Sequence, residues 1–337
     1  MERTRRAVFA ATLVLLLALP LCTRPAGATR RKSAQKGPLL FAAVIEQNEV
    51  QAWDVDGNLV ARMPTGVAPR ALALWKDSLV VANRGLDRAP ASSLTIIDPN
   101  RLVPVKTRYI CENCAPRALA FDREGNLWVT AQAHRAVLVL PPPWDDPAAT
   151  VMVSWGWPCD LAFAADGRRL FVGFRGSKEV GIVDTRDKRS ISVEVESVPE
   201  HVVRRPGHDE IWATVSPRGR IAILVPRKDV LDASVEQFPA VVFPRGLDFT
   251  PDGKLLFVAA AGPMKILGYD ADTRKVVSEL PLDEEPELVS VSPDGKHLAF
   301  SVPGRGQVGI ASISGDGSLV LQHLVDVGGR VGAFLWR

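Results

Sequence analysis

Residues 244–260, PRGLDFTPDGKLLFVAA, join a proline, a short apolar strand, an Asp-Gly turn and a second apolar strand. The same phrase recurs as PRALALWKDSLVVAN from Pro69, PCDLAFAADGRRLFVGF from Pro158 and PELVSVSPDGKHLAFSV from Pro286, with looser copies from Pro116 and Pro199. Consecutive copies begin 47, 42, 41, 45 and 42 residues apart. A period of this length with about four strands per period is typical of a β-propeller, because a four-stranded blade needs neighbours to cover both its faces.

Two fragments remain outside the six units. Residues 39–66 read as the second, third and fourth strands of a blade, and residues 329–337 read as a lone first strand. Joining them would close the ring and leave no open sheet edge. The sequence therefore predicts an all-β chain whose residues 39–337 form a single seven-bladed propeller of four-stranded antiparallel blades. The copy from Pro199 departs most, because RRPGHDEIWAT replaces the Asp-Gly turn.

The first residues read as an export signal. Residues 1–28 contain a basic start, a short apolar run and a small-residue cleavage site, which predicts a signal peptide and a periplasmic or secreted protein. No second such run follows, so no transmembrane segment is expected after processing. Residues 29–38 are basic and read as a flexible linker. We expect the mature protein to be a monomer.

The charge balance changes once these segments are set aside. Residues 39–337 hold 33 of the 41 basic residues and 37 of the 38 acidic residues. The surplus of positive charge thus belongs to the first 38 residues, and the bulk charge does not favour nucleic-acid binding.

The repeats resemble those of the YVTN-type, lactonase-like seven-bladed propellers. The resemblance rests on SPDGKHLAFS (292–301), TPDGKLLFVAA (250–260), and ADGRRLFVGF (165–174) with EVGIVDT (179–185). It covers nearly all of the mature chain and implies the fold. The wider group contains lactonases, redox-associated propellers and extracellular binding proteins, so the resemblance implies no single function.

The first strand of each blade should line the propeller axis, with its first residues at the mouth of the channel. The residue after each repeat proline, or after Gly329 in the last blade, forms a predicted ring: Arg70, Arg117, Cys159, Glu200, Arg245, Glu287 and Arg330. Asp160 and His201 come next in their strands. Loops between second and third strands bring Arg84, His134, Arg135 and Arg175 to the same face.

Charges around this ring suggest a binding site. Glu200, Arg245, Glu287 and Arg330 alternate in sign, so neighbours can form ion pairs. Arg330, Arg70 and Arg117 are consecutive with no acid between them, and such a trio suits a carboxylate or a phosphate. Alternatively, these arginines bond carbonyl groups between the blades or extend to water.

Three cysteines remain in the mature chain: Cys111, Cys114 and Cys159. A local bond between Cys111 and Cys114 would leave Cys159 free at the channel mouth, whereas Cys114 could instead bridge to Cys159 in the next blade. Export permits either disulfide. Because no histidine follows the C-x-x-C and no second pair exists, neither a haem nor a zinc site is expected.

Catalytic signatures are scarce. The chain contains no G-x-S-x-G, HExxH or glycine-rich phosphate loop, and no cofactor is expected. The sequence favours an exported scaffold that binds a small anionic molecule or a protein partner at the basic axial mouth. A lactonase-like hydrolase using the same face and a periplasmic redox accessory protein remain open.

Overall fold

The structure is a computed structural model that describes residues 37–85, 91–147, 149–153 and 156–337. The predicted signal peptide and all but the last two residues of the predicted linker lie outside the described residues. No helix in the described part of the chain is long and apolar enough to cross a membrane.

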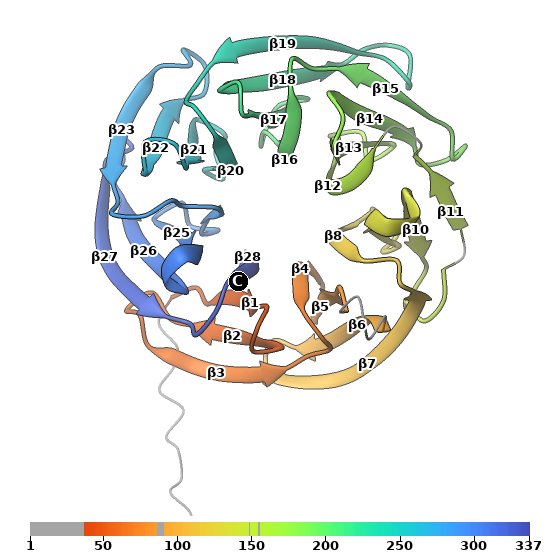
Figure 1. Cartoon of the computed structure of the whole chain (residues 1–337), viewed down its shortest axis with the longest axis horizontal. Helices are drawn as coiled ribbons and strands as arrows, with labels where there is room; N and C mark the ends of the chain where they lie inside the picture. Colours follow the sequence, from red (N-terminus) through yellow and green to blue (C-terminus); the bar gives the residue numbers. More distant parts are fainter. Residues whose placement is uncertain (1–36, 86–90, 148, 154–155) are drawn as a thin grey trace, which may run out of the picture. The chain divides into compact units, whose positions relative to one another are not determined.

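Residues 39–337 form a seven-bladed β-propeller, as the repeat predicts (Figure 1). Written from innermost to outermost strand, blade 1 contains β4 (Pro69–Trp75), β5 (Ser78–Asn83), β6 (Ala91–Asp98) and β7 (Val103–Glu112). Blade 2 contains β8 (Pro116–Phe121), β9 (Leu127–Ala131), β10 (Ala136–Leu140) and β11 (Ala149–Met152). Blade 3 contains β12 (Trp157–Phe163), β13 (Arg169–Arg175), β14 (Glu179–Asp184) and β15 (Ser190–Glu194).

Blade 4 contains β16 (Val198–Arg204), β17 (Ile211–Ser216), β18 (Arg220–Pro226) and β19 (Ala233–Pro239). Blade 5 contains β20 (Pro244–Phe249), β21 (Leu255–Ala260), β22 (Lys265–Asp270) and β23 (Val276–Pro281). Blade 6 contains β24 (Val289–Val291), β25 (His297–Val302), β26 (Gln307–Ile313) and β27 (Leu319–Asp326). Two short 3-10 turns, η1 (Gln132–His134) and η2 (Pro303–Arg305), are the helical elements of the described residues.

Blade 7 is closed by both ends of the chain, as predicted. The C-terminal strand β28 (Val331–Trp336) is innermost, followed by β1 (Leu40–Val44), β2 (Glu49–Trp53) and β3 (Leu59–Pro64). β28 pairs antiparallel with β1, and Leu39 and Arg337 exchange backbone hydrogen bonds at 2.6 and 2.9 Å. The ring therefore has no unpaired inner edge between its first and last blades.

The core is divided among the junctions of the ring. Buried apolar side chains of the described residues form seven clusters, and each cluster is shared by two adjacent blades. The middle strands are buried along their whole length, as β9 and β10 illustrate, whereas the outer strand β27 is largely exposed. This arrangement is expected of stacked repeats that cannot bury both faces alone.

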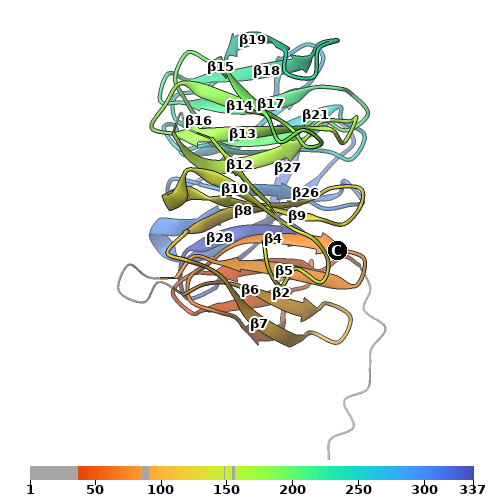
Figure 2. The ribbon, with the colours of Figure 1, turned by 90° about the vertical axis from the view of Figure 1, so that its right-hand side faces the viewer.

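The turns fall on two opposite faces, because the strands run along the propeller axis (Figure 2). In blades 3, 5 and 6 an Asp-Gly pair joins the first and second strands, with Gly167, Gly253 and Gly295 all at φ +70°. Blade 4 keeps this turn without the Asp-Gly pair, because Gly207 adopts φ +74° there. The opposite face carries the loops between second and third strands and the start of each inner strand; we call it the mouth face.

Candidate functional site

The inner strands share a break in pairing just after the repeat proline. Register shifts lie between Pro158 and Asp160 in β12 and between Pro199 and His201 in β16. Equivalent breaks occur in β4, β8 and β20. An extra residue in a strand redirects the local side chains. The redirected residue is the one that follows the proline, which is the position that the sequence predicted to form the ring.

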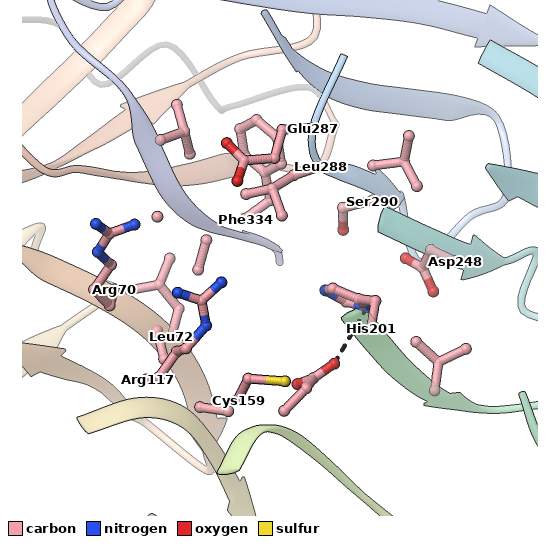
Figure 3. Close-up of a pocket in the computed structure, with 18 of the residues that line it drawn as sticks. Arg70, Leu72, Arg117, Cys159, His201, Asp248, Glu287, Leu288, Ser290 and Phe334 are labelled. Atoms are coloured by element: carbon pink, nitrogen blue, oxygen red, sulfur yellow. Dashed lines mark ion pairs between the residues drawn. The ribbon is translucent and has the colours of Figure 1, made fainter. Parts of the chain in front are cut away.

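An axial cavity of about 250 Å³ opens among these inner strands (Figure 3). Its lining includes seven of the predicted residues: Arg70, Arg117, Cys159, Asp160, Glu200, His201 and Glu287. Asp248 and Ser290, which the sequence analysis did not select, also line it. Apolar side chains, among them Leu72, Leu119 and Phe334, complete the surface. The cavity therefore combines a cluster of charged side chains of both signs with a smaller apolar surface.

Arg70 and Arg117 form one side of the cavity, which we call the arginine wall (Figure 3). No hydrogen bond or ion pair within the described residues holds the guanidinium of Arg117. The Nε of Arg70 is buried without a hydrogen-bond partner. Burial, and then the positive charges of Arg117, Arg330 and Arg84, lower the pKa of Arg70 to about 10. A pKa of about 10 leaves Arg70 cationic at neutral pH, so the arginine wall carries positive charge that no ion pair within the described residues neutralises.

The third member of the predicted arginine trio, Arg330, is paired with an acid and is not a free cation. Its charge reaches Arg70, but its Nε donates to Glu46 Oε1 at 2.7 Å and its backbone N–H donates to Glu46 Oε2 at 2.7 Å. Glu46 comes from the loop between β1 and β2, so an acid that the linear ring order did not include compensates Arg330. Arg330 does not line the axial cavity.

The other side of the cavity carries Asp160, Glu200, Asp248 and Glu287, which we call the acidic wall. Glu200 is held by two arginines: Arg175 Nη2 donates to its Oε2 at 3.1 Å, and Arg245 Nη1 donates to its Oε1 at 3.4 Å. The predicted pairing of Glu200 with Arg245 is thus confirmed. Arg175 and Arg245 do not line the cavity, and they serve to neutralise Glu200.

Asp160 and Asp248 play equivalent roles in two blades. Asp160 Oδ2 accepts the backbone N–H of Val202 in the next blade at 2.7 Å. Asp248 Oδ2 likewise accepts the backbone N–H of Val291 in the next blade at 2.9 Å. Asp248 stands two residues further along its inner strand than Asp160 does, on the same alternating face. Strand alternation was therefore the signal that could have found Asp248.

His201 and Asp248 are two ionisable residues of the cavity lining. The Nδ1 of His201 lies 3.3 Å from Asp160 Oδ2 (Figure 3), but it is buried without a hydrogen-bond partner among the described residues, so the two side chains are close without being hydrogen-bonded. Desolvation by the channel walls raises the pKa of Asp248 to about 6, against the opposing effect of its backbone hydrogen bonds. A carboxyl group with a pKa near 6 can take up or release a proton close to neutral pH.

Glu287 differs from the rest of the acidic wall. Its carboxylate has no hydrogen bond or ion pair among the described residues, and it acts on Arg70 through space. Figure 3 shows it across the cavity from Arg117, on the side of Ser290. The predicted pairing of Glu287 with Arg330 does not occur, because Arg330 binds Glu46 instead.

Cysteine chemistry is confined to one local bond. Cys111 and Cys114 form a disulfide, so Cys159 is free and the alternative bridge from Cys114 to Cys159 is wrong. Cys159 is buried, and its Sγ points toward the carbonyl oxygens of Gly173 (3.4 Å) and Pro199 (3.8 Å). Desolvation raises the pKa of this thiol to about 12, which keeps it protonated and unreactive.

The remaining predicted residues lie on the mouth face outside the cavity. His134 ends η1, Arg135 follows it at φ 51°, and both side chains are exposed. Arg84 lies close enough to act on the pKa of Arg70 but is not part of the lining. Among the described residues, no cluster of three or more His, Cys, Asp or Glu side chains is arranged to hold a metal ion.

Comparison with known proteins supports the propeller fold and does not identify a function. No protein-family model and no curated protein sequence matches the chain. A periplasmic gluconolactonase of Pseudomonas aeruginosa is similar in structure, with a TM-score of 0.74 and 16% identity over 89% of this chain and 98% of that one. A putative 6-phosphogluconolactonase of Bacteroides fragilis gives 0.73 and 14% over 90% and 99%. A chain of Kuenenia stuttgartiensis hydrazine synthase gives 0.70 and 17% over 86% and 99%.

These likenesses show the fold. Proteins described as lactonases and a hydrazine synthase share it at comparable scores, so the fold does not choose between hydrolysis, binding and redox roles. The choice has to come from the charges and contacts of the axial cavity.

Proposed function

We propose that the protein binds a small molecule through a carboxylate group in the axial cavity, with Arg70 and Arg117 as the anion-binding pair. The observation that carries this proposal is the unsatisfied arginine wall. Among the described residues, the guanidinium of Arg117 has no partner, and the Nε of Arg70 beside it is buried without a hydrogen bond. Desolvated cations are costly unless an anion pairs with them. Two arginines side by side can bond a carboxylate with parallel hydrogen bonds.

The surroundings favour a singly charged anion over a phosphate. Asp160 and Glu287 share the cavity with the arginines, and their charges would repel a dianion more strongly than a carboxylate. A volume of about 250 Å³ suits a compact organic acid, and Leu72, Leu119 and Phe334 offer apolar contact to its carbon skeleton.

An exported location is part of the proposal. The predicted signal peptide supports it, and so does the disulfide between Cys111 and Cys114, since such bonds persist in oxidising compartments. The periplasmic gluconolactonase of similar fold is compatible with this location.

Calorimetric titration of the purified protein with a panel of monocarboxylic acids tests the binding site. Arg117→Ala should lower the affinity of any acid that binds by about 10- to 100-fold, because a charge-assisted hydrogen bond is removed. Arg245→Ala is the matched control, since Arg245 has the same repeat position but is bonded to Glu200 outside the cavity. Equal affinity in wild type and Arg117→Ala would contradict the proposal.

A hydrolase that opens lactones is the second candidate, favoured by the contact between His201 and Asp160. In this scheme His201 takes a proton from water as the water oxygen bonds to the lactone carbonyl carbon. The ring C–O bond then breaks, and the ring oxygen receives that proton from His201. The new carboxylic acid loses its remaining proton to water, and the arginine wall binds the resulting carboxylate.

Turnover of a lactone panel separates the two candidates. Hydrolysis that is lost in His201→Ala, with the melting temperature unchanged, would support the enzyme. Carboxylate binding without hydrolysis of any lactone would support the binding protein and exclude the lactone hydrolase.

A further inference from the structure

The axial cavity holds unsatisfied charges of both signs. Arg70 and Arg117 form the arginine wall, and Glu287 stands across the cavity, where its carboxylate forms no ion pair or hydrogen bond with any residue that the structure describes. The lack of an ion pair at Glu287 is informative because, in the same ring, Glu200 forms ion pairs with both Arg175 and Arg245. Opposite charges that stay apart in a partly desolvated site are costly, and a molecule that bridges them would recover the lost interactions.

We propose, building on the carboxylate site described above, that the axial cavity takes a zwitterion of amino-acid size. The ligand's carboxylate lies against Arg70 and Arg117, and its ammonium lies against Glu287. The arrangement matches charge with charge at both ends, so it discriminates against molecules that carry only one of the two groups.

Groups beside Glu287 extend the ammonium subsite. Asp248 and Ser290 line the same side of the cavity (Figure 3). Each Asp248 oxygen accepts one backbone N–H, from Phe249 and Val291, and a carboxylate oxygen can accept a second donor. An ammonium has three donors, which the Glu287 carboxylate and the Ser290 hydroxyl can accept, while Asp248 already binds the Ser290 side chain. The raised pKa of Asp248 is consistent with a site that lacks its cation.

The apolar lining indicates the third part of the ligand. Leu72 lies on the side of the arginine wall, and Leu288 and Phe334 lie between the two charged ends (Figure 3). Leu119, on the same strand as Arg117, also lines the cavity. These side chains cannot hydrogen-bond a polar substituent, so an amino acid with an apolar side chain fits better than one with a charged side chain. A volume of about 250 Å³ accommodates a molecule of this size.

Calorimetric titration with three matched compounds tests the inference: L-leucine, its 2-hydroxy acid and its amide. The hydroxy acid lacks the ammonium, and the amide lacks the carboxylate. We expect L-leucine to bind at least about 10-fold more tightly than either relative, since each loses one charge-assisted contact. L-Phenylalanine with its two relatives serves as a second series.

Variants assign the effect to one residue. Glu287→Gln should remove the preference for L-leucine over its hydroxy acid, with about equal affinities remaining. Glu285→Gln is the matched control, because Glu285 is exposed in the same segment and does not line the cavity. It should retain the preference.

The outcomes separate this inference from the carboxylate site. If the hydroxy acids bind as tightly as the amino acids, and Arg117→Ala weakens both, the zwitterion inference is overturned and the carboxylate site stands. If neither series binds wild type while other monocarboxylates do, the inference is likewise overturned. If no carboxylate of any kind binds, both proposals fail.

Discussion

Arg70, Arg117 and Arg245 follow the repeat proline in three blades, yet they differ in whether an acid pairs with the guanidinium. Arg245 and its neighbour Arg175 share Glu200, so three charged groups satisfy one another at the acidic wall. Arg70 and Arg117 face the cavity, and no acid in the described part of the chain forms an ion pair with them. The same residue at the same repeat position is thus part of the scaffold in blade 5 and an open cation in blades 1 and 2.

The contrast shows where the molecule accepts an energetic cost. Most of the acidic wall is accommodated: Asp160 and Asp248 accept backbone N–H groups, and Glu200 binds two arginines. The arginine wall receives no equivalent support. Unsatisfied charges that persist in an otherwise well-bonded structure mark functional sites. If the arginine wall is such a site, substitutions in the two walls should change the free energy of unfolding in different ways.

The largest expected effect concerns Asp248 and pH. Its pKa is raised to about 6 in the folded protein from an ordinary value of 3.8. The folded state therefore binds its proton more tightly, so this group favours folding at low pH and opposes it once the carboxyl ionises. Relative to Asp248→Asn, wild type should lose about 2 kcal/mol of unfolding free energy between about pH 4 and about pH 7, allowing for screening by water in the cavity.

Urea unfolding of both proteins across this range measures the difference. Asp184→Asn provides a control of opposite sign, because Arg168 lowers the pKa of Asp184 to about 2 and its stabilising effect is lost only as pH falls toward that value. A wild-type minus Asp248→Asn difference that does not change with pH would show that the acidic wall holds Asp248 as easily as it holds Glu200.

A smaller effect is expected when the acidic wall is made to resemble the arginine wall. Glu200→Gln removes the charge that Arg175 and Arg245 share, leaving two adjacent guanidiniums without an acid. We expect the unfolding free energy to fall by about 1–2 kcal/mol, less than for a fully buried pair because both arginines are partly exposed. Denaturant titration measures it, and an unchanged midpoint would mean that water already satisfies these arginines.

The reverse substitution should stabilise the protein. Arg70→Met removes a desolvated cation whose Nε has no partner, while the apolar stem is kept. Without ligand, we expect the unfolding free energy to rise by about 1 kcal/mol, since the removed charge was opposed by burial and by neighbouring arginines. Arg245→Met is the matched control and should be neutral or destabilising. If both variants destabilise equally, the two walls are not energetically distinct.

The sequence predicted the fold almost in full because the repeat is local. Each copy specifies two strands and a turn, and a run of such units can bury its faces only by stacking into a ring. The incomplete ends identified the closing blade, and β28 does pair with β1. Blade 4 held its turn although Asp-Gly is replaced, since Gly207 supplies the same backbone conformation.

The site was predicted less completely because it depends on contacts between blades. Seven of the predicted side chains line the cavity, whereas Arg245 and Arg330, which have the same repeat position as Arg70 and Arg117, do not. Arg330 was wrongly grouped with the free cations, because Glu46 reaches it across 284 residues of sequence. Which arginine finds an acid is decided by loop geometry, which the repeat pattern does not encode.

The smallest expected signal comes from Cys159, the ring residue of blade 3. Because burial raises the pKa of its thiol to about 12, only about one molecule in ten thousand is a thiolate at about pH 8. Iodoacetamide should therefore leave Cys159 unmodified in the folded protein and modify it fully in urea, as mass spectrometry of its peptide would show. Rapid modification of the folded protein would mean that this part of the ring opens to solvent. Protection would show that a ring position can be sealed into the scaffold, which leaves the arginine wall as the part of the ring open to a ligand.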